Sequence, residues 1–302
     1  MSYVYYPGCS LKGLGRAYEE SLLAVFDVLN MHLKELPDWN CCGATAYMAI
    51  DESKSFALSA RNLALAGRQR SGDEMVHLIA PCNACYLALT KTQRYVEEYD
   101  DVSREIRTAL EAARMQYENK VRVRHPLDVL VNDIGLDAVA DQIRRPLSGL
   151  KVACYYGCQI VRPYATFDDQ HDPLTMEQLM LASGAEAVDW PLKTRCCGGS
   201  LTGTIQDVGL RLNYILLKEA EKRGADVIAT ICPLCQFNLE CYQPRIRRRF
   251  KDAVRMPIVY FSQLMGSAFG IPERKLGMHR LFVPLRLKPA PKAMEGGQYV
   301  HS

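Results

Sequence analysis

The chain has 302 residues, of which 48% are apolar and 24% charged, and its net charge is only +3. This composition is typical of a globular protein with length for one large or two ordinary domains, and it excludes general polyanion binding. The N-terminus lacks the basic and apolar regions of a secretory signal, and no stretch approaches the ~18 apolar residues of a membrane span. We therefore expect a cytoplasmic protein without a membrane span.

The first half of the chain predicts an alternation of short strands and helices. The apolar run 76–81 leads directly into Cys82, which is typical of a buried strand in a parallel sheet. Residues 100–119 are charged and helical in pattern, and we interpret them as an exposed helical insertion. The other predicted elements are a β-prone run that ends at Gly8-Cys9, helices at 17–33 and 54–70, a helix from Tyr86, and a strand, turn and helix over 121–135.

The second half predicts the same order of elements. They are a run ending at Gly157-Cys158, helices at 175–183 and 206–223, a strand at 227–231, a helix from Gln236, and a strand, turn and helix over 257–270. This predicts an α/β protein with two homologous domains, each a mostly parallel sheet flanked by helices, related by a pseudo-twofold. We place the domains at 1–148 and 149–273, followed by a flexible basic tail at 274–302.

Ten of the twelve cysteines form one five-cysteine pattern that occurs twice. Each copy has a lone cysteine, an adjacent pair followed by glycine, and a C-x-x-C. Because ligands bind at the carboxyl ends of parallel strands, we expect the thiols to gather there. Cys154 and Cys241 stand outside the pattern, and we interpret them as spare cysteines. The two sets are Cys9, Cys41, Cys42, Cys82 and Cys85, and Cys158, Cys196, Cys197, Cys232 and Cys235.

So many cysteines in a chain without a visible secretory signal are typical of metal binding or catalysis. Thiolates select iron–sulfur clusters, zinc or copper(I). The two C-x-x-C motifs could together form one tetrahedral zinc site, but that interpretation leaves six cysteines of the pattern unexplained. Iron–sulfur binding uses all ten, and the backbone N–H groups of Gly43 and of Gly198-Gly199 are candidate donors to the sulfurs.

Two polar segments have alternative interpretations. Residues 168–172, which contain three aspartates and His171, could form a metal or proton-relay cluster, but helix capping is the favoured interpretation. The cationic run 245–251 is interpreted first as a solvated helix face and second as a docking patch for an acidic partner. Nothing else in the sequence favours nucleic acid. There is no G-x-G-x-x-G after a strand, so we expect no flavin or NAD site on this chain.

These motifs resemble those of the CCG-domain family, and over residues 1–272 the chain is similar to the B-type subunits of heterodisulfide reductases and of sulfur-oxidising heterodisulfide-reductase-like complexes. The motifs include Tyr5-Tyr6-Pro7-Gly8-Cys9, Arg162-Pro163 and Cys232-Pro-Leu-Cys235. The first copy departs from the pattern where Ala44 follows the glycine and where its C-x-x-C lacks proline, although no ligand position is lost.

The resemblance implies two noncubane [4Fe-4S] clusters, one on each five-cysteine set, with a disulfide cleaved between them. It implies an oxidoreductase acting on sulfur groups, whose substrate is a heterodisulfide or a carrier-bound sulfur. It also implies a ferredoxin-like cubane [4Fe-4S] partner of C type and a flavin-containing partner of A type. The alternatives are an electron-transfer subunit that serves another enzyme's active site, and a structural zinc protein.

Overall fold

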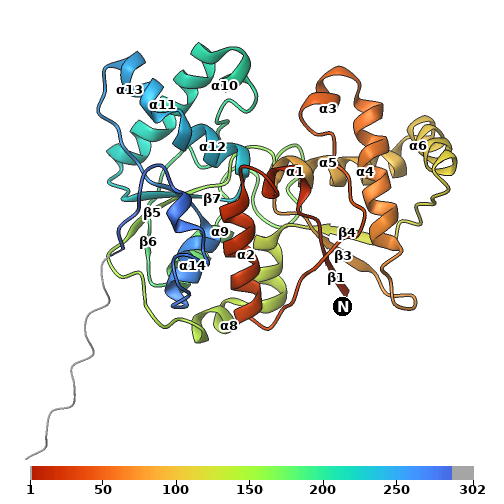
Figure 1. The fold of residues 1–302 in the computed structure, drawn as a ribbon, viewed down its shortest axis with the longest axis horizontal. Helices are drawn as coiled ribbons and strands as arrows, with labels where there is room; N and C mark the ends of the chain where they lie inside the picture. Colours follow the sequence, from red (N-terminus) through yellow and green to blue (C-terminus); the bar gives the residue numbers. More distant parts are fainter. Residues whose placement is uncertain (1, 288–302) are drawn as a thin grey trace, which may run out of the picture.

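The computed structural model describes residues 2–287 as two lobes, each built around a four-stranded parallel sheet (Figure 1). The predicted fold class is thereby confirmed. In the first lobe the strand order is β2-β1-β3-β4, and in the second it is β6-β5-β7-β8, so the topology is repeated. The strands are β1 Ser2–Tyr5, β2 Lys34–Glu35, β3 Val76–Ile79, β4 Val121–Arg124, β5 Lys151–Tyr155, β6 Glu186–Ala187, β7 Val227–Thr230 and β8 Ile258–Tyr260.

Helices flank both sheets, and most of them match a predicted element. The main helices of the first lobe are α1 Gly8–Leu11, α2 Arg16–Val28, α3 Ala46–Ile50, α4 Glu52–Gly67, α5 Asn83–Glu98, α6 Asp100–Ala112, α7 Pro126–Asp128 and α8 Leu136–Asp141, with a π-helical turn at Val129–Ile134. Those of the second lobe are α9 Thr175–Ala182, α10 Leu201–Thr204, α11 Gln206–Lys222, α12 Pro233–Cys241, α13 Gln243–Phe250 and α14 Phe261–Ala268, with a 3₁₀ turn at Met278–Arg280.

The central strands of each sheet carry the chain into the cysteine motifs. Strands β3 and β7 are buried at every position, as expected for parallel strands covered on both faces. Strand β1 pairs in parallel with β3, and β5 pairs in parallel with β7. All four therefore end at the carboxyl edge of their sheet, immediately before a cysteine-bearing segment.

A helix near the start of each lobe packs against helices at the end of the other lobe. Helix α2 lies against α14, where the rings of Tyr18 and Tyr260 stack with centroids 4.4 Å apart, and the Oγ atoms of Ser21 and Ser262 are 2.7 Å apart. Reciprocally, α9 contacts α7 and α8. One continuous hydrophobic core accordingly contains buried residues from both lobes.

The segment from residue 274 differs from the flexible tail that the sequence predicted. Leu276 is fully buried, the guanidinium of Arg280 forms an ion pair with Glu20 on α2, and the backbone N–H groups of Phe282 and Val283 donate to Glu240. Apolar residues within the basic run give residues 274–287 a face that packs against the body of the protein. The remainder of the predicted tail, 288–302, lies outside the described residues.

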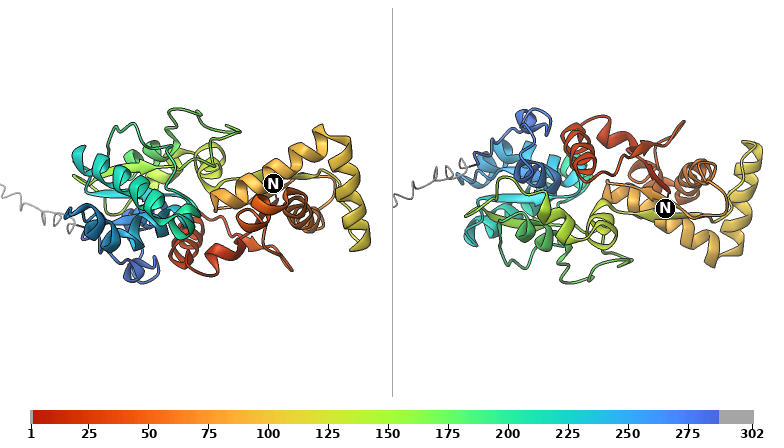
Figure 2. Two further views of the ribbon diagram at one scale, coloured as in Figure 1. Left: turned by 90° about the horizontal axis from the view of Figure 1, so that it is seen from above. Right: turned by 90° about the horizontal axis from the view of Figure 1, so that it is seen from below.

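The predicted insertion at 100–119 forms helix α6 over its first thirteen residues. This helix packs against α4 through Ile106 and Leu110 and exposes most of its other side chains. Figure 2 shows it at the opposite end of the molecule from α13. Over residues 2–287, no helix combines the length and apolar character that a membrane crossing requires.

Candidate functional site

The first five-cysteine set meets at the carboxyl edge of its sheet. Cys9 lies on α1, and its sulfur is 3.8 Å from the sulfur of Cys41. The sulfur of Cys42 is 3.3 Å from that of Cys85, which lies on the first turn of α5. Cys82 precedes the same helix, and its thiol and that of Cys85 shift each other's pKa. The structure therefore brings together all five cysteines that the repeat predicted.

The second set has the same arrangement. The sulfur of Cys197 is 3.5 Å from that of Cys235 on α12, and the thiols of Cys158 and Cys196 shift each other's pKa. Cys232 precedes α12, and its thiol and that of Cys235 shift each other's pKa. Each half of the chain thus contributes a complete set, as its repeated spacing predicted.

Cys82 and Cys232 join the two sets. The thiol of each shifts the pKa of the other, and each residue is only 3% exposed. The amide of Asn83 donates to the backbone carbonyl of Tyr156 across the same junction, at 2.7 Å. At the outer ends, Cys9, Cys41 and Cys196 are exposed to solvent. The ten thiols therefore extend from solvent, through a buried centre between the lobes, to solvent again.

The spare cysteines lie elsewhere. Cys154 is fully buried in β5, where its carbonyl accepts a hydrogen bond from the indole of Trp190, and burial raises the pKa of its thiol. Cys241 is the last residue of α12 and is half-buried. Neither thiol contacts another cysteine in the described part of the chain, which supports their exclusion from the two sets.

Neighbouring thiols shift each other's protonation. A hydrogen bond from Cys42 is the largest cause that lowers the pKa of Cys41, to about 2, and a hydrogen bond from Cys158 lowers that of Cys196 to about 6. The partner thiols Cys9 and Cys158 have raised pKa values, first because each is hydrogen-bonded to that thiolate. The outer thiols of each set therefore include one that is readily ionised, and thiolate is the form that binds metals.

Glycines make room for the sulfurs in both lobes. Gly8 and Gly157 have φ values of +64° and +69°, and a Cβ atom on either would lie 3.0 Å from the sulfur of Cys85 or Cys235, respectively. The N–H of Gly43 donates to Cys41 at 3.4 Å, and that of Gly198 donates to Cys196 at 3.3 Å. The predicted glycine donors are thus present, and the backbone approaches the sulfurs closely because no side chain intervenes.

The loops that carry the adjacent cysteine pairs are held by polar side chains that no motif had indicated. In the first lobe, the hydroxyls of Ser55 and Ser59 on α4 donate to the carbonyl of Cys42. In the second, Asn213 on α11 donates to the carbonyl of Cys197 at 3.0 Å. Ser59 and Asn213 thus have the same role at equivalent places, and the change of residue type hides this support in the internal sequence repeat.

The five thiols of each set suit an iron–sulfur cluster better than a single metal ion. Five thiols in each set exceed the four ligands of a tetrahedral zinc site, and they are mostly buried, close to backbone N–H donors. Within residues 2–287, no three His, Cys, Asp or Glu side chains are arranged so that they could hold one metal ion. The C-x-x-C motifs do meet through Cys82 and Cys232, but Cys85 and Cys235 are also committed to Cys42 and Cys197.

Two further polar features are explained by structure. Asp168 accepts hydrogen bonds from the backbone N–H groups of Leu174 and Thr175 at the start of α9, which supports the capping interpretation. The imidazole of His125 is buried, which lowers its pKa to about 3, and its Nδ1 accepts from the N–H of Leu127.

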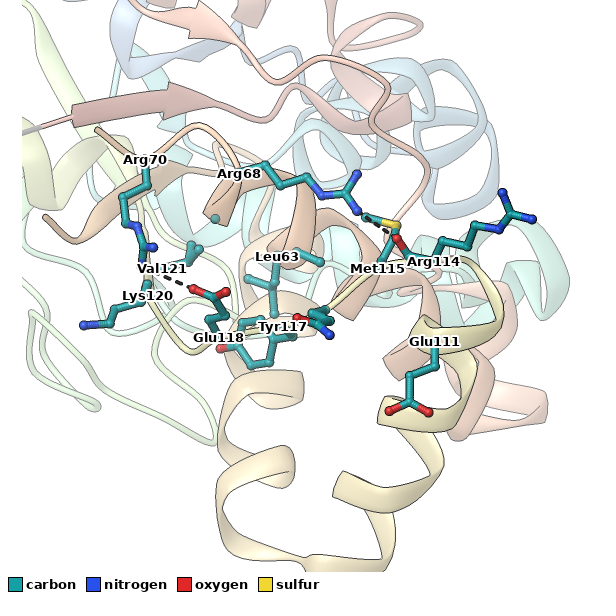
Figure 3. A pocket seen from close by; sticks show the side chains of 13 residues that line it. Leu63, Arg68, Arg70, Glu111, Arg114, Met115, Tyr117, Glu118, Lys120 and Val121 are labelled. Carbon is teal, nitrogen blue, oxygen red and sulfur yellow. Dashed lines mark hydrogen bonds and ion pairs between the residues drawn. The ribbon is translucent and has the colours of Figure 1, made fainter. Parts of the chain in front are cut away.

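Two cavities lie away from the cysteines. One, of about 560 Å³, is formed by α4, α6 and the start of β4, and Figure 3 shows the side chains of Arg68, Arg70 and Glu118 around it. Another, of about 1,020 Å³, lies beside the segment between the lobes and the start of β5. Neither is lined by any of the twelve cysteines.

Comparison with known proteins agrees with the repeat. The family model for the CCG cysteine-rich domain matches residues 3–90 and 152–240. The 8-methylmenaquinol:fumarate reductase membrane anchor subunit of Wolinella succinogenes is 30% identical over 92% of this chain and 95% of its own length. A protein of Archaeoglobus profundus, named for its likeness to the B-type subunit of heterodisulfide reductase, is 28% identical over 92% of this chain and 94% of its own.

Two other relatives extend the comparison. The B-type subunit of the ferredoxin:CoB-CoM heterodisulfide reductase of Methanosarcina mazei is 26% identical over 90% of this chain and 91% of its own. A hypothetical protein from Helicobacter pylori, known from a crystal structure, superimposes with a TM-score of 0.71 at 14% identity over 94% of this chain. The chain spans about half of that protein (52%), and the likeness concerns the fold alone.

Proposed function

The chain belongs to the CCG cysteine-rich domain family and is similar to the B-type subunits of heterodisulfide reductases, and on that premise we propose that it is the iron–sulfur catalytic subunit of such a complex. In this role it cleaves or forms a disulfide or persulfide, on a heterodisulfide or on carrier-bound sulfur. The observation that carries the proposal is that two complete five-thiol sets meet at the buried residues Cys82 and Cys232, beside the hydrogen bond from Asn83 to the carbonyl of Tyr156. Two redox centres held that close could together serve one two-electron substrate.

The ten cysteines of the two sets are the proposed ligands of two noncubane [4Fe-4S] clusters. Bound iron would supply open coordination positions and one-electron redox capacity to a sulfur substrate. The protein's own contribution is to bury the inner thiols, to direct the N–H groups of Gly43 and Gly198 at the outer ones, and to leave the outer ones accessible. These hydrogen bonds and this burial would tune the reduction potential.

We further propose the electron-transfer partners and the compartment of the chain. Since it carries no flavin or NAD motif, electrons would pass through a ferredoxin-like cubane [4Fe-4S] partner of C type and a flavin-containing partner of A type. All twelve cysteines are free, which suits a reducing compartment such as the cytoplasm. We also propose domain boundaries at 148/149 and 273/274, with residues 274–287 as a segment that contacts both lobes.

The test uses the complex purified without oxygen. Iron and acid-labile sulfide are measured first, and the EPR spectrum is then recorded before and after addition of coenzyme M–coenzyme B heterodisulfide or a carrier-bound persulfide. We expect both elements in the preparation and a changed spectrum with one of the substrates. A preparation with zinc and no labile sulfide would instead establish the structural zinc alternative.

The second candidate function is electron transfer to another enzyme's active site. The specific observation that favours it is the Wolinella relative, whose name describes a subunit of a reductase for fumarate rather than for a disulfide. If the clusters are reduced and reoxidised within the complex while no disulfide or persulfide changes their EPR spectrum, this function replaces the first.

A further inference from the structure

Exposed and half-buried apolar side chains lie on α10 and α11 of the second lobe and at Ile205 between the two helices. Ile205, Val208 and Ile215 are 57%, 45% and 41% exposed. On α11, spacings of four and three residues place Val208, Leu212 and Ile215 on one helix face, as in the seam between paired helices. Leu201 on α10 and Ile205 between the two helices precede them. We call these residues the apolar stripe, and it consists of Leu201, Ile205, Val208, Leu212 and Ile215.

The two most exposed stripe positions of α11 are charged in the equivalent helix of the first lobe. Counted from the first residue of each helix, Val208 and Ile215 of α11 correspond to Lys54 and Arg61 of α4. There, Lys54 pairs with Asp51, and Arg61 pairs with another aspartate. Since the same fold forms with charged residues at these positions, its stability does not require the exposed apolar ones.

A cationic surface borders the stripe. Helix α13 packs on α11, where Arg249 pairs with Asp207 at 3.2 Å and the Arg211 guanidinium lies over the Phe250 ring. Residues 245–251 contain four arginines and one lysine without an acidic residue, more positive charge than the net +3 of the whole chain, so the rest of the chain is net negative. Arg248 is exposed and has no acidic partner among residues 2–287. Figure 1 shows α10, α11 and α13 together at one end of the molecule.

The stripe is also connected to the second cysteine set. Helix α10 follows the Cys196-Cys197 loop, and Thr202 on it packs directly on Gly209 of α11. Asn213 of α11 holds the carbonyl of Cys197. A partner bound along α10 and α11 would therefore touch the two helices that support this loop.

We propose that the apolar stripe and the arginines of α13 dock an acidic amphipathic helix of a protein partner. The stripe residues of α11 have the spacing that accepts a helix face, and the cations beside them select acidic flanks. A second copy of this chain suits the surface less well, since a twofold dimer would bring two cationic surfaces together. The proposal concerns a surface and does not depend on what the thiols hold.

The test places a photo-crosslinking amino acid at position 208 of the full chain within its native complex, with position 54 as the matched control in the first lobe. Mass spectrometry identifies the cross-linked peptide. We expect a peptide from an acidic helix of another protein at position 208, well above the yield at position 54. Cross-linking to lipid, to a second copy of the chain or to a segment without acidic residues would overturn the proposal, as would equal yields at both positions.

Matched variants give the second measurement, with the purified cross-linked partner as the probe. Val208→Lys combined with Ile215→Arg introduces the residue types of the first lobe, and we expect at least a tenfold weaker Kd because two aliphatic side chains lose their contact. Arg247→Glu combined with Arg248→Glu should weaken binding and reduce its salt dependence. The thermal midpoint checks the fold of both variants. Unchanged binding by two folded variants would refute the docking surface.

Discussion

Gly157→Ala should disturb the second cysteine set through one added methyl group. Gly157 has a φ of +69°, and its Cβ would lie 3.0 Å from the sulfur of Cys235, closer than the 3.5–4.0 Å of an ordinary contact. Gly149 is a matched control, because its φ is +75° and nothing lies within 4 Å of its Cβ position. Both variants carry the same backbone strain, and only one crowds a thiol.

The strain of a left-handed alanine is about 1–2 kcal/mol in either variant. Overpacking against Cys235 adds roughly 1–3 kcal/mol in Gly157→Ala. At roughly 2–4 °C per kcal/mol, Gly149→Ala should lower the thermal midpoint by a few degrees and Gly157→Ala by about twice as much.

The decisive readout is the iron content after anaerobic reconstitution, measured with labile sulfide. Because one of two proposed sets is crowded, Gly157→Ala should lose up to about half of the wild-type iron, whereas Gly149→Ala should keep all of it. Equal iron contents in the two variants would refute the view that position 157 must be glycine to leave room for the sulfur of Cys235.

Three further predictions concern the surrounding framework. Burial raises the pKa of Glu240 to about 7, so the stability that its protonated form contributes is lost as the pH rises through 7. Between pH 5 and 8, the thermal midpoint of Glu240→Gln should therefore vary less than that of the wild type. An equal dependence of the two midpoints on pH would contradict this. The Cβ of Gly209→Ala would lie 2.3 Å from a backbone carbon of α10, so we expect a loss of at least 1–3 kcal/mol by thermal unfolding, against little change for Gly203→Ala, which faces open space; similar losses would refute the close contact. The buried hydroxyl of Tyr18 has no hydrogen-bond partner in the described structure, so Tyr18→Phe should be as stable as wild type, whereas Tyr18→Ala should lose about 3–5 kcal/mol with its stack on Tyr260; a Phe variant as unstable as the Ala variant would show that the hydroxyl is bonded.

The cysteine sets and the order of elements could be predicted because both are written in local patterns. Spacing between thiols survives as a motif, and an apolar run before a C-x-x-C indicates a buried strand. Element ends were less accurate for a physical reason that is visible at α2. The helix was expected to continue to residue 33 but ends at Val28, where Asn30 adopts a φ of +57°.

Long-range features could not be predicted from one sequence. Nothing local indicates that Tyr18 stacks on Tyr260 or that Leu276 is buried, since each depends on a partner far away in the chain. The supports of the cysteine loops differ between the lobes, with Ser59 in one and Asn213 in the other, so the internal repeat did not reveal them. The stripe likewise becomes informative only once its exposure is known.

The reciprocal packing of α2 on α14 and of α9 on α7 and α8 has a consequence for how such a duplicated gene can change. Each half completes the surface of the other, so a truncation that keeps one intact cysteine set would still leave a helix without its apolar cover. We therefore expect both copies to be retained together in one chain. Under this packing constraint, surface positions such as 208 and 215 can still diverge, and one copy can acquire a binding partner that the other lacks.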